Sequence, residues 1–334
     1  MAAIQAFSRD IAQRFASPED QTLLALSGGG ASGAFGAGVL VGWSERGDRP
    51  EFDIVTGVST GALTAPFAFL GPEWDDELQA AYTDGRTEGL LDSDQFAIFR
   101  GPSLFSAAAL RSLVDESVTL EMMQAIAVEY RAGRALLVAT TNLDTQETVI
   151  WNMGLLATEG EAALPVFRDI LVASASIPGV FPPVLIPGVN DDGQVVMEMH
   201  VDGSVNTPFV AIPEDMLMSS SVRPSTGKVR VFIVLNGQLG RNTGVTPGRI
   251  RDIVARTFDS MSKAQARQVL ASTAAFAARN NLILSLAAIP DELSISSLDF
   301  EAESMQALFE LGRSRSMAEQ AWSPVELRDA TEVP

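Results

Sequence analysis

A serine set between two glycines is the first feature of this sequence that could do chemistry. Residues 57–61 read Gly-Val-Ser-Thr-Gly, the G-x-S-x-G pattern of a nucleophile elbow, in which a tight strand-to-helix turn exposes the hydroxyl of Ser59. An activated serine hydroxyl can attack acyl groups and form an acyl-enzyme. An ordinary turn in which Ser59 caps the following helix would show the same pattern, so both interpretations remain open at this point.

A second glycine motif precedes the serine. The stretch LALSGGGASGAFGAG, residues 24–38, holds Gly28, Gly30 and Gly33 at the G-x-G-x-x-G spacing of a dinucleotide-binding loop. Such a site also needs an acidic residue at the end of the next strand, where it binds the ribose. The nearest candidate, Asp53, stands at the beginning of the next predicted strand. It therefore belongs to the wrong edge of the sheet.

The glycines fit another role beside Ser59. Acyl transfer from a serine creates a tetrahedral oxyanion, and loss of one N–H donor to it costs roughly 3–4 kcal/mol. The glycine loop follows one predicted strand and Ser59 follows the next, so both emerge at the carboxyl edge of a parallel sheet. The sequence predicts that the amides of Gly28, Gly29 and Gly30 form an oxyanion hole.

The serine needs a base, and the sequence offers two candidates. The one histidine, His200, lies in MEMHVDGSVNTP, two residues before Asp202. On a strand these two side chains share one face, so either could reach a serine. A histidine would act within a Ser-His-Asp triad, whereas an aspartate would have to accept the proton directly.

The composition excludes several function classes. The 334 residues carry a formal net charge of −19, which argues against a nucleic-acid partner and against general adhesion to anionic membranes, although a local basic patch remains compatible. The chain has no cysteine and one histidine, so we expect no disulfide, no metal and no other cofactor. The N-terminal residues show no export signal, which favours a cytoplasmic location, with peripheral membrane contact still compatible.

The order of predicted elements indicates the fold. Apolar runs predict strands over residues 22–27, 52–58, 134–141, 147–151, 195–201 and 228–236, and helical patterns cover residues 34–45, 61–70, 120–131, 164–174, 247–280 and 303–319. This alternation predicts an α/β fold, a three-layer α/β/α sandwich around a mainly parallel sheet. We expect an N-terminal helical extension (1–21), a catalytic core (22–238) and a mainly helical C-terminal part (239–334) packed on the same domain.

Together these motifs resemble those of the patatin-like phospholipase family. The G-G-G-x-x-G stretch, the G-x-S-x-G elbow, the block ASASIPGVFPPV (residues 173–184) and an Asp-Gly pair follow one another in the family's order over residues 22–210. The resemblance implies a Ser59–Asp202 dyad without a catalytic histidine, and an oxyanion hole in residues 28–30. The other motif glycines are Gly33, Gly57, Gly61 and Gly203.

The resemblance also implies a substrate class, namely acyl esters of glycerophospholipids or neutral lipids. A Ser-Asp dyad needs a partly dry pocket that makes the aspartate more basic, and we expect its apolar walls to be Phe181, Pro182, Pro183 and Val184. His200 is then a hydrogen-bonded, partly buried strand residue.

Two residues depart from the family pattern. Ser32 stands where many members carry Arg or Lys, which weakens the inference of an anionic head group. Ser204 stands where Gly or Ala is usual.

Two segments could meet a lipid. The helix after Pro247 either packs on the core with a solvated basic face or contacts head groups; its apolar residues are Ile250, Val254, Phe258, Met261 and Ala264, and its basic residues are Arg249, Arg256, Lys263 and Arg267. Residues 83–106 form either an apolar cover over the pocket or a plain surface loop.

Other functions compete with a lipid acyl hydrolase. A thioesterase or an acyltransferase could use the same dyad, because other nucleophiles can also resolve an acyl-enzyme. A non-catalytic lipid-binding or nucleotide-binding protein, in which Ser59 is only structural, is the alternative from a different class. The sequence does not indicate an oligomeric state.

Overall fold

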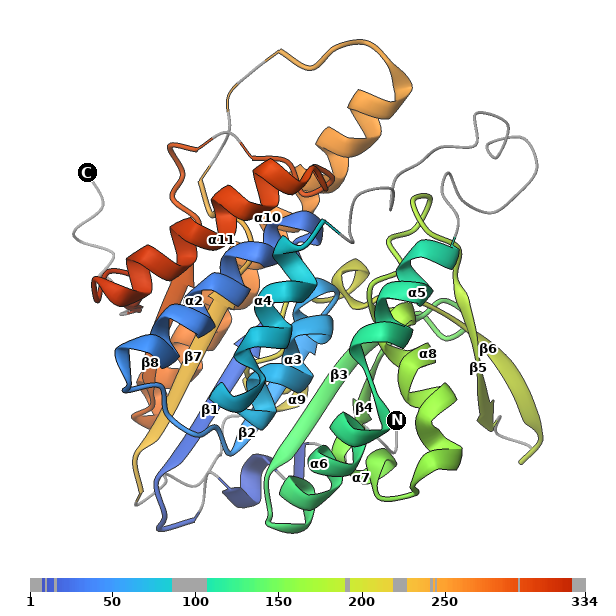
Figure 1. The fold of residues 1–334 in the computed structure, drawn as a ribbon, viewed down its shortest axis with the longest axis vertical. Coiled ribbons are helices and arrows are strands. Elements are labelled where there is room, and N and C mark those ends of the chain that lie inside the picture. Colours follow the sequence, from blue (N-terminus) through green and yellow to red (C-terminus); the bar gives the residue numbers. More distant parts are fainter. Residues whose placement is uncertain are drawn as a thin grey trace.

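A mixed sheet with helices on both faces forms the molecule (Figure 1). The computed structural model describes residues 8–9, 11–14, 17–85, 107–189, 193–218, 227–240, 243, 245–293 and 295–325. None of the helices in these ranges combines the length and the apolar character needed to cross a bilayer.

Parallel strands form the centre of the sheet, in the order β3-β2-β1-β7-β8. They are β1 (Gln21–Leu26), β2 (Ile54–Val58), β3 (Ala135–Asn142), β7 (Val229–Leu235) and β8 (Ile283–Ala288). Antiparallel strands extend the sheet at both sides: β4 (Glu147–Asn152), β5 (Val184–Val189), β6 (Val195–Asp202) and β9 (Ser323–Pro324). Strands β1 and β2 are buried along their whole length, as expected for parallel strands covered on both faces.

Two hydrophobic clusters cover the two faces of the sheet. Leu24 and Leu26 of β1 pack with α2 (Gly33–Arg46), α3 (Thr60–Leu70), α4 (Asp75–Thr83), α5 (Ala107–Ser117), α6 (Leu120–Arg131), α7 (Met153–Ala157), α8 (Leu164–Ser174) and α11 (Ala302–Met317). Leu23 and Ala25 point the other way and pack with Ile11, α9 (Glu214–Leu217) and α10 (Ile250–Asn280). The predicted three-layer sandwich around a mainly parallel sheet is confirmed.

Strands β5, β8 and β9 were not predicted from the sequence. Strand β5 contains Pro187 and Gly188, which are depleted in strands, but it is the edge strand and pairs only with β6, where proline is tolerated. Strand β8 is a short apolar run directly after a long helix, and β9 has only two residues. None of the three had a local pattern strong enough to separate it from its surroundings.

Strands β2 and β6 lie end to end along one edge of β3. Strand β2 pairs with β3 as far as Ala139, opposite Val58, and β6 begins its pairing at Thr140, opposite Asp202. Strand β4 occupies the other edge of β3 over the same residues. Because β2 runs parallel and β6 antiparallel to β3, their carboxyl ends meet. Ser59 directly follows β2, so this register brings it to Asp202.

Helices α2 and α11 lie side by side, with glycines at their contact (Figure 1). A Cβ atom on Gly38 would lie 2.8 Å from the carbonyl carbon of Phe309, and one on Gly312 would lie 2.9 Å from the backbone nitrogen of Val39. The two backbones therefore approach more closely than any side chain would allow.

We expect Gly312→Ala to lower the free energy of unfolding. Overpacking a helix contact costs about 1–3 kcal/mol, which outweighs the gain of about 0.8–1 kcal/mol in helix propensity. Chemical denaturation measures the difference. Gly248→Ala is the control, because a Cβ atom there would meet nothing within 4 Å. A Gly312→Ala protein as stable as the wild type would contradict the close approach of the helices.

Candidate active site

Ser59 occupies a strained turn between β2 and α3. Its φ of 56° and ψ of −127° form a conformation that residues with a side chain rarely adopt. The flanking glycines make room for the turn, because a Cβ atom on Gly57 would lie 2.6 Å from the Cα atom of Ala62, and one on Gly61 would lie 2.6 Å from the carbonyl carbon of Leu26. The Ser59 side chain makes no capping hydrogen bond to α3. The alternative of a helix-capping serine is therefore wrong.

Ser59 and Asp202 are joined by a short hydrogen bond. The Ser59 hydroxyl donates to Oδ2 of Asp202 at 2.5 Å, and the two residues are only 3% and 1% exposed. Oδ1 of Asp202 accepts the N–H of Ser204 at 2.7 Å, and the N–H of Asp202 donates to the carbonyl of Ser176 at 2.9 Å. Both the backbone and the carboxylate of Asp202 are thus held in place.

The dry surroundings change the basicity of Asp202. Burial raises the pKa of its carboxyl group to about 6, because removal from water disfavours the charged form, while hydrogen bonds from Ser59 and Ser204 oppose this increase. A carboxylate with this pKa is mostly ionised at neutral pH and can still accept a proton in a transition state.

Ser174, at the end of α8, holds the turn that carries Ser59. Its hydroxyl accepts the N–H of Ser59 at 3.0 Å and donates to the carbonyl of Ala139 at 2.7 Å. Ser174 belongs to the block of residues 173–184, and no role was predicted for it. The position of this serine in that block was the signal that could have pointed to it.

His200 lies on β6 near Asp202 but hydrogen-bonds to Thr140 instead. Its Nδ1 atom is 2.9 Å from the Thr140 hydroxyl, and its Nε2 atom is 3.6 Å from Oε2 of Glu198. The residue is fully buried, rather than partly buried as expected, and its ring packs against that of Trp151. Burial lowers the pKa of His200, and the Glu198 carboxylate opposes this. In the described part of the chain, no hydrogen bond links His200 to Ser59 or Asp202.

The glycine loop after β1 lies directly beside Ser59. A Cβ atom on Gly28 would lie 3.1 Å from that of Ser59. The N–H of Gly28 donates to the carbonyl of Pro208 at 3.0 Å. The N–H groups of Gly29 and Gly30 have no acceptor among the residues that the structure describes. Two of the three expected amides are therefore without a protein acceptor in the described structure, and the amide of Gly28 is already engaged.

The remaining motif glycines allow close approaches around this loop. A Cβ atom on Gly29 would lie 2.7 Å from that of Asn236, and Gly30 has a φ of 55°. A Cβ atom on Gly33 would lie 2.7 Å from the methyl group of Thr60, and one on Gly203 would lie 2.6 Å from the carbonyl oxygen of Ala139.

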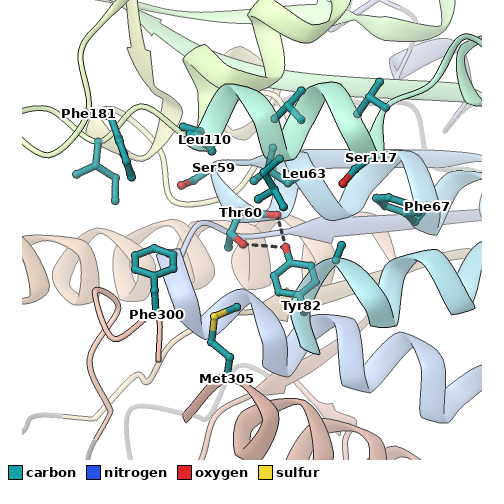
Figure 2. Close-up of a pocket in the computed structure, with 17 residues that line it drawn as sticks. Ser59, Thr60, Leu63, Phe67, Tyr82, Leu110, Ser117, Phe181, Phe300 and Met305 are labelled. Carbon is teal, nitrogen blue, oxygen red and sulfur yellow. Dashed lines mark hydrogen bonds between the residues drawn. The ribbon is translucent and has the colours of Figure 1, made fainter. Parts of the chain in front are cut away.

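An apolar pocket opens on one side of Ser59. Figure 2 shows Leu63, Leu110, Phe181, Phe300 and Met305 around it, contributed by elements far apart in the sequence. The buried Tyr82 also lines it, and its hydroxyl lies 2.9 Å from the Thr60 hydroxyl and 2.7 Å from that of Thr64. Of the four predicted wall residues, only Phe181 lines this pocket; Pro182, Pro183 and Val184 do not.

A second pocket, the polar pocket, lies against the glycine loop and also reaches Ser59. Among its lining residues are Gly29, Gly30, Ser59, Asp202 and Lys263. Ser59 and Gly30 line both pockets, so Ser59 stands where an apolar and a polar cavity meet.

Helix α10 does not follow the expected pattern of an apolar face turned inward. Met261 is 58% exposed, whereas the side chain of Lys263 is only 12% exposed. The inward face of α10 instead carries Ala266, Thr273, Ala274, Phe276 and Ala277. The prediction of a core-packed apolar face with a solvated basic face is therefore wrong at Met261 and Lys263. The side chains of Ile250, Val254 and Phe258 lie outside the described residues, as do residues 86–106 of the expected pocket cover.

Asp53 has a structural role away from the site. Its carboxylate accepts the N–H of Thr22 at 2.7 Å, which ties together the first residues of β1 and β2. This position agrees with the expectation that Asp53 cannot serve a ribose at the glycine loop. The described residues contain no group of three or more His, Cys, Asp or Glu side chains arranged to hold a metal ion.

The raised pKa of Asp202 predicts a stability difference that depends on pH. Asp202 binds its proton more tightly in the folded protein, with a pKa of about 6, than at its ordinary value of 3.8. The contribution of this group to wild-type stability should therefore fall by about 3 kcal/mol in total as pH rises from about 3 to about 7. Asp202→Asn has no such proton to lose and should be more stable than the wild type at pH 8 but not at pH 4. Urea denaturation of both proteins measures this, and a difference that does not change with pH would contradict the burial of a charged Asp202.

Comparisons with known proteins show which family this chain is related to. A family model described as patatin-like phospholipase matches residues 24–213, more than half of the chain. Patatin-2-Kuras 2 of Solanum tuberosum is 26% identical over 216 residues, and the match covers 60% of this chain and 52% of that relative, about half its length. Two solved structures are also similar: VipD from Legionella pneumophila (TM-score 0.41, 16% identity, 93% of this chain and 69% of that chain) and the type III effector protein ExoU (0.32, 13%, 93% and 55%). The match of the family model over residues 24–213 shows that this chain belongs to the patatin-like phospholipase family.

Proposed function

We propose that this chain hydrolyses carboxylic esters of lipids, with Ser59 as the nucleophile and Asp202 as the base. The observation that carries the proposal is the 2.5 Å hydrogen bond from Ser59 Oγ to Asp202 Oδ2 in a buried site. Membership of the patatin-like phospholipase family supports a lipid acyl ester as the substrate.

The acylation step uses groups that already surround Ser59. Ser59 Oγ attacks the ester carbonyl carbon while its proton passes to Oδ2 of Asp202. The carbonyl oxygen becomes an oxyanion, and the N–H groups of Gly29 and Gly30 donate to it. When the tetrahedral intermediate collapses, the alcohol leaves with the proton from Asp202, and the acyl group stays on Ser59.

Deacylation repeats these steps with water. Asp202 takes a proton from the attacking water, the same two amides stabilise the second oxyanion, and the proton returns to Ser59 Oγ as the fatty acid leaves. The carboxylate alternates between acceptor and donor, so a pKa of about 6 suits both halves of the cycle.

The apolar pocket fits the acyl chain. Its walls carry leucine, valine, phenylalanine and methionine side chains, and it opens at Ser59 (Figure 2). Burial of each methylene group there contributes about 0.8 kcal/mol to binding. The ester carbonyl would then lie at the polar junction of the two pockets.

Contact with a lipid surface is part of this proposal. The hairpin of β5 and β6 exposes a row of paired apolar side chains, Leu185 opposite Met199 and Val189 opposite Val195. Strand β6 ends at Asp202, whose side chain lies on the opposite face of the strand from this row. Exposed apolar rows of this kind occur where proteins meet membranes or other proteins.

A substrate screen with one serine variant tests the proposal. The wild type should hydrolyse p-nitrophenyl esters and phospholipids, and a fluorophosphonate should label Ser59 alone, because only an activated serine attacks phosphorus rapidly. Ser59→Ala should lose at least 10³-fold in kcat and all labelling.

Ser117→Ala is the matched control, since Ser117 lines the apolar pocket without a hydrogen-bond partner for its hydroxyl in the described chain. It should keep wild-type activity. Labelling that persists in Ser59→Ala, or a folded wild type that hydrolyses no ester, would refute the proposed function. Saturable binding of NAD or ATP would favour the nucleotide-binding alternative.

A further inference from the structure

One basic side chain reaches the site from a distant part of the chain. Lys263 lines the polar pocket, and no other lysine or arginine lines either pocket among the described residues. It lies on α10, outside the segment that the family model matches. The glycine loop itself brings no cation, because Ser32 is neutral and buried, and its hydroxyl has no partner in the described structure.

Lys263 places a largely buried ammonium group at the polar pocket. Its side chain is 12% exposed, an unusual degree of burial for a lysine. Its Nζ atom lies 3.5 Å from Oδ2 of Asp259, longer than a usual hydrogen bond, and the same carboxylate oxygen lies 3.9 Å from Arg256. One oxygen of Asp259 therefore lies near two cations, and it makes no hydrogen bond of ordinary length to Lys263.

The geometry of an ester at Ser59 determines what enters the polar pocket. The two substituents of the carbonyl carbon leave it in different directions, and the acyl chain takes the apolar pocket. The alkoxy group, which is the leaving group, then faces the polar pocket and Lys263. In a glycerophospholipid that leaving group carries a phosphodiester, whereas in a neutral acylglycerol it carries no charge.

We propose that Lys263 binds the phosphodiester of a glycerophospholipid and makes this enzyme prefer phospholipids to neutral acylglycerols. The inference rests on the proposed function for the position of the ester. Asp202 and Asp259 also line this pocket and would repel an anionic leaving group, and the Lys263 ammonium opposes that repulsion. Lysine donates charge-assisted hydrogen bonds to phosphate oxygens.

Binding of lipids that cannot be hydrolysed tests this inference without catalysis. A diether phospholipid with one phosphodiester and a dialkylglycerol with the same chains are each titrated in non-ionic micelles. The wild type should bind the phospholipid more tightly. Lys263→Met, which keeps the aliphatic stem, should weaken phospholipid binding roughly 10- to 100-fold and leave dialkylglycerol binding unchanged. Lys263→Arg should restore most of the preference.

Lys228→Met is the matched control. Lys228 is the other lysine of the chain, and it is exposed next to the amino end of β7, at the opposite edge of the sheet from Ser59. The Lys228→Met variant should bind both lipids as the wild type does. Hydrolysis of a phospholipid and a diacylglycerol with the same acyl chains should show the same selective loss in kcat/KM for Lys263→Met.

Three results would overturn the inference: equal losses on both lipids in Lys263→Met, an unchanged preference in that variant, or saturable binding of glycerol 3-phosphate as tight as that of the diether phospholipid. The last would indicate a soluble phosphate ligand instead. A separate result would refute the hydrolase proposal alone: neither the wild type nor any variant hydrolyses an ester, but Lys263→Met still loses the preference for the phospholipid. The inference about the phosphodiester would then stand.

Discussion

The site depends on two strands that share one edge of β3 end to end. Val58 pairs with Ala139 and Asp202 pairs with the next residue, Thr140, so β2 and β6 deliver Ser59 and Asp202 to the same point. A register slip of one residue would turn Asp202 to the other face of the sheet. The hydrogen bond from the Asp202 N–H to the carbonyl of Ser176 opposes such a slip.

This arrangement brings several features that destabilise the folded protein together at the site. Ser59 has a strained backbone, Asp202 is a buried carboxyl group, and the amides of Gly29 and Gly30 have no partner in the described protein. Each would destabilise the fold by itself. The hydrophobic clusters on both faces of the sheet offset them, and the same features give a basic carboxylate and free N–H donors at the serine.

Much of this site could be predicted because its parts are local in sequence. The glycine loop, the elbow at Ser59 and the Asp-Gly pair are each short patterns whose chemistry follows from residue types, and helices 120–131 and 164–174 have the predicted bounds. The pairing of Ser59 with Asp202 came from family resemblance. From the residues alone, His200 remained an equal candidate for the base.

The features of the fold and site that could not be predicted depend on contacts between segments far apart in the sequence, which no local pattern encodes. The engagement of the Gly28 amide requires Pro208, and the support of Ser59 requires Ser174 and Ala139. Helical periodicity assigned Lys263 to the solvent, but the pocket beside the glycine loop accepts its side chain. Edge strand β5 was not predicted because it contains Pro187. Proline is tolerated there only because the strand has a single neighbour.

The central claim is that Asp202, and not His200, takes the proton of Ser59. The most direct measurement is the pH profile of kcat/KM on a p-nitrophenyl ester for the wild type, Asp202→Asn and His200→Gln. The base must be ionised, so wild-type activity should rise with pH through about 6 and then level off. His200→Gln should keep this pH dependence and most of the activity. Asp202→Asn should lose roughly 10³- to 10⁴-fold in kcat/KM. A folded His200→Gln protein as inactive as Ser59→Ala, beside an active Asp202→Asn, would contradict the account.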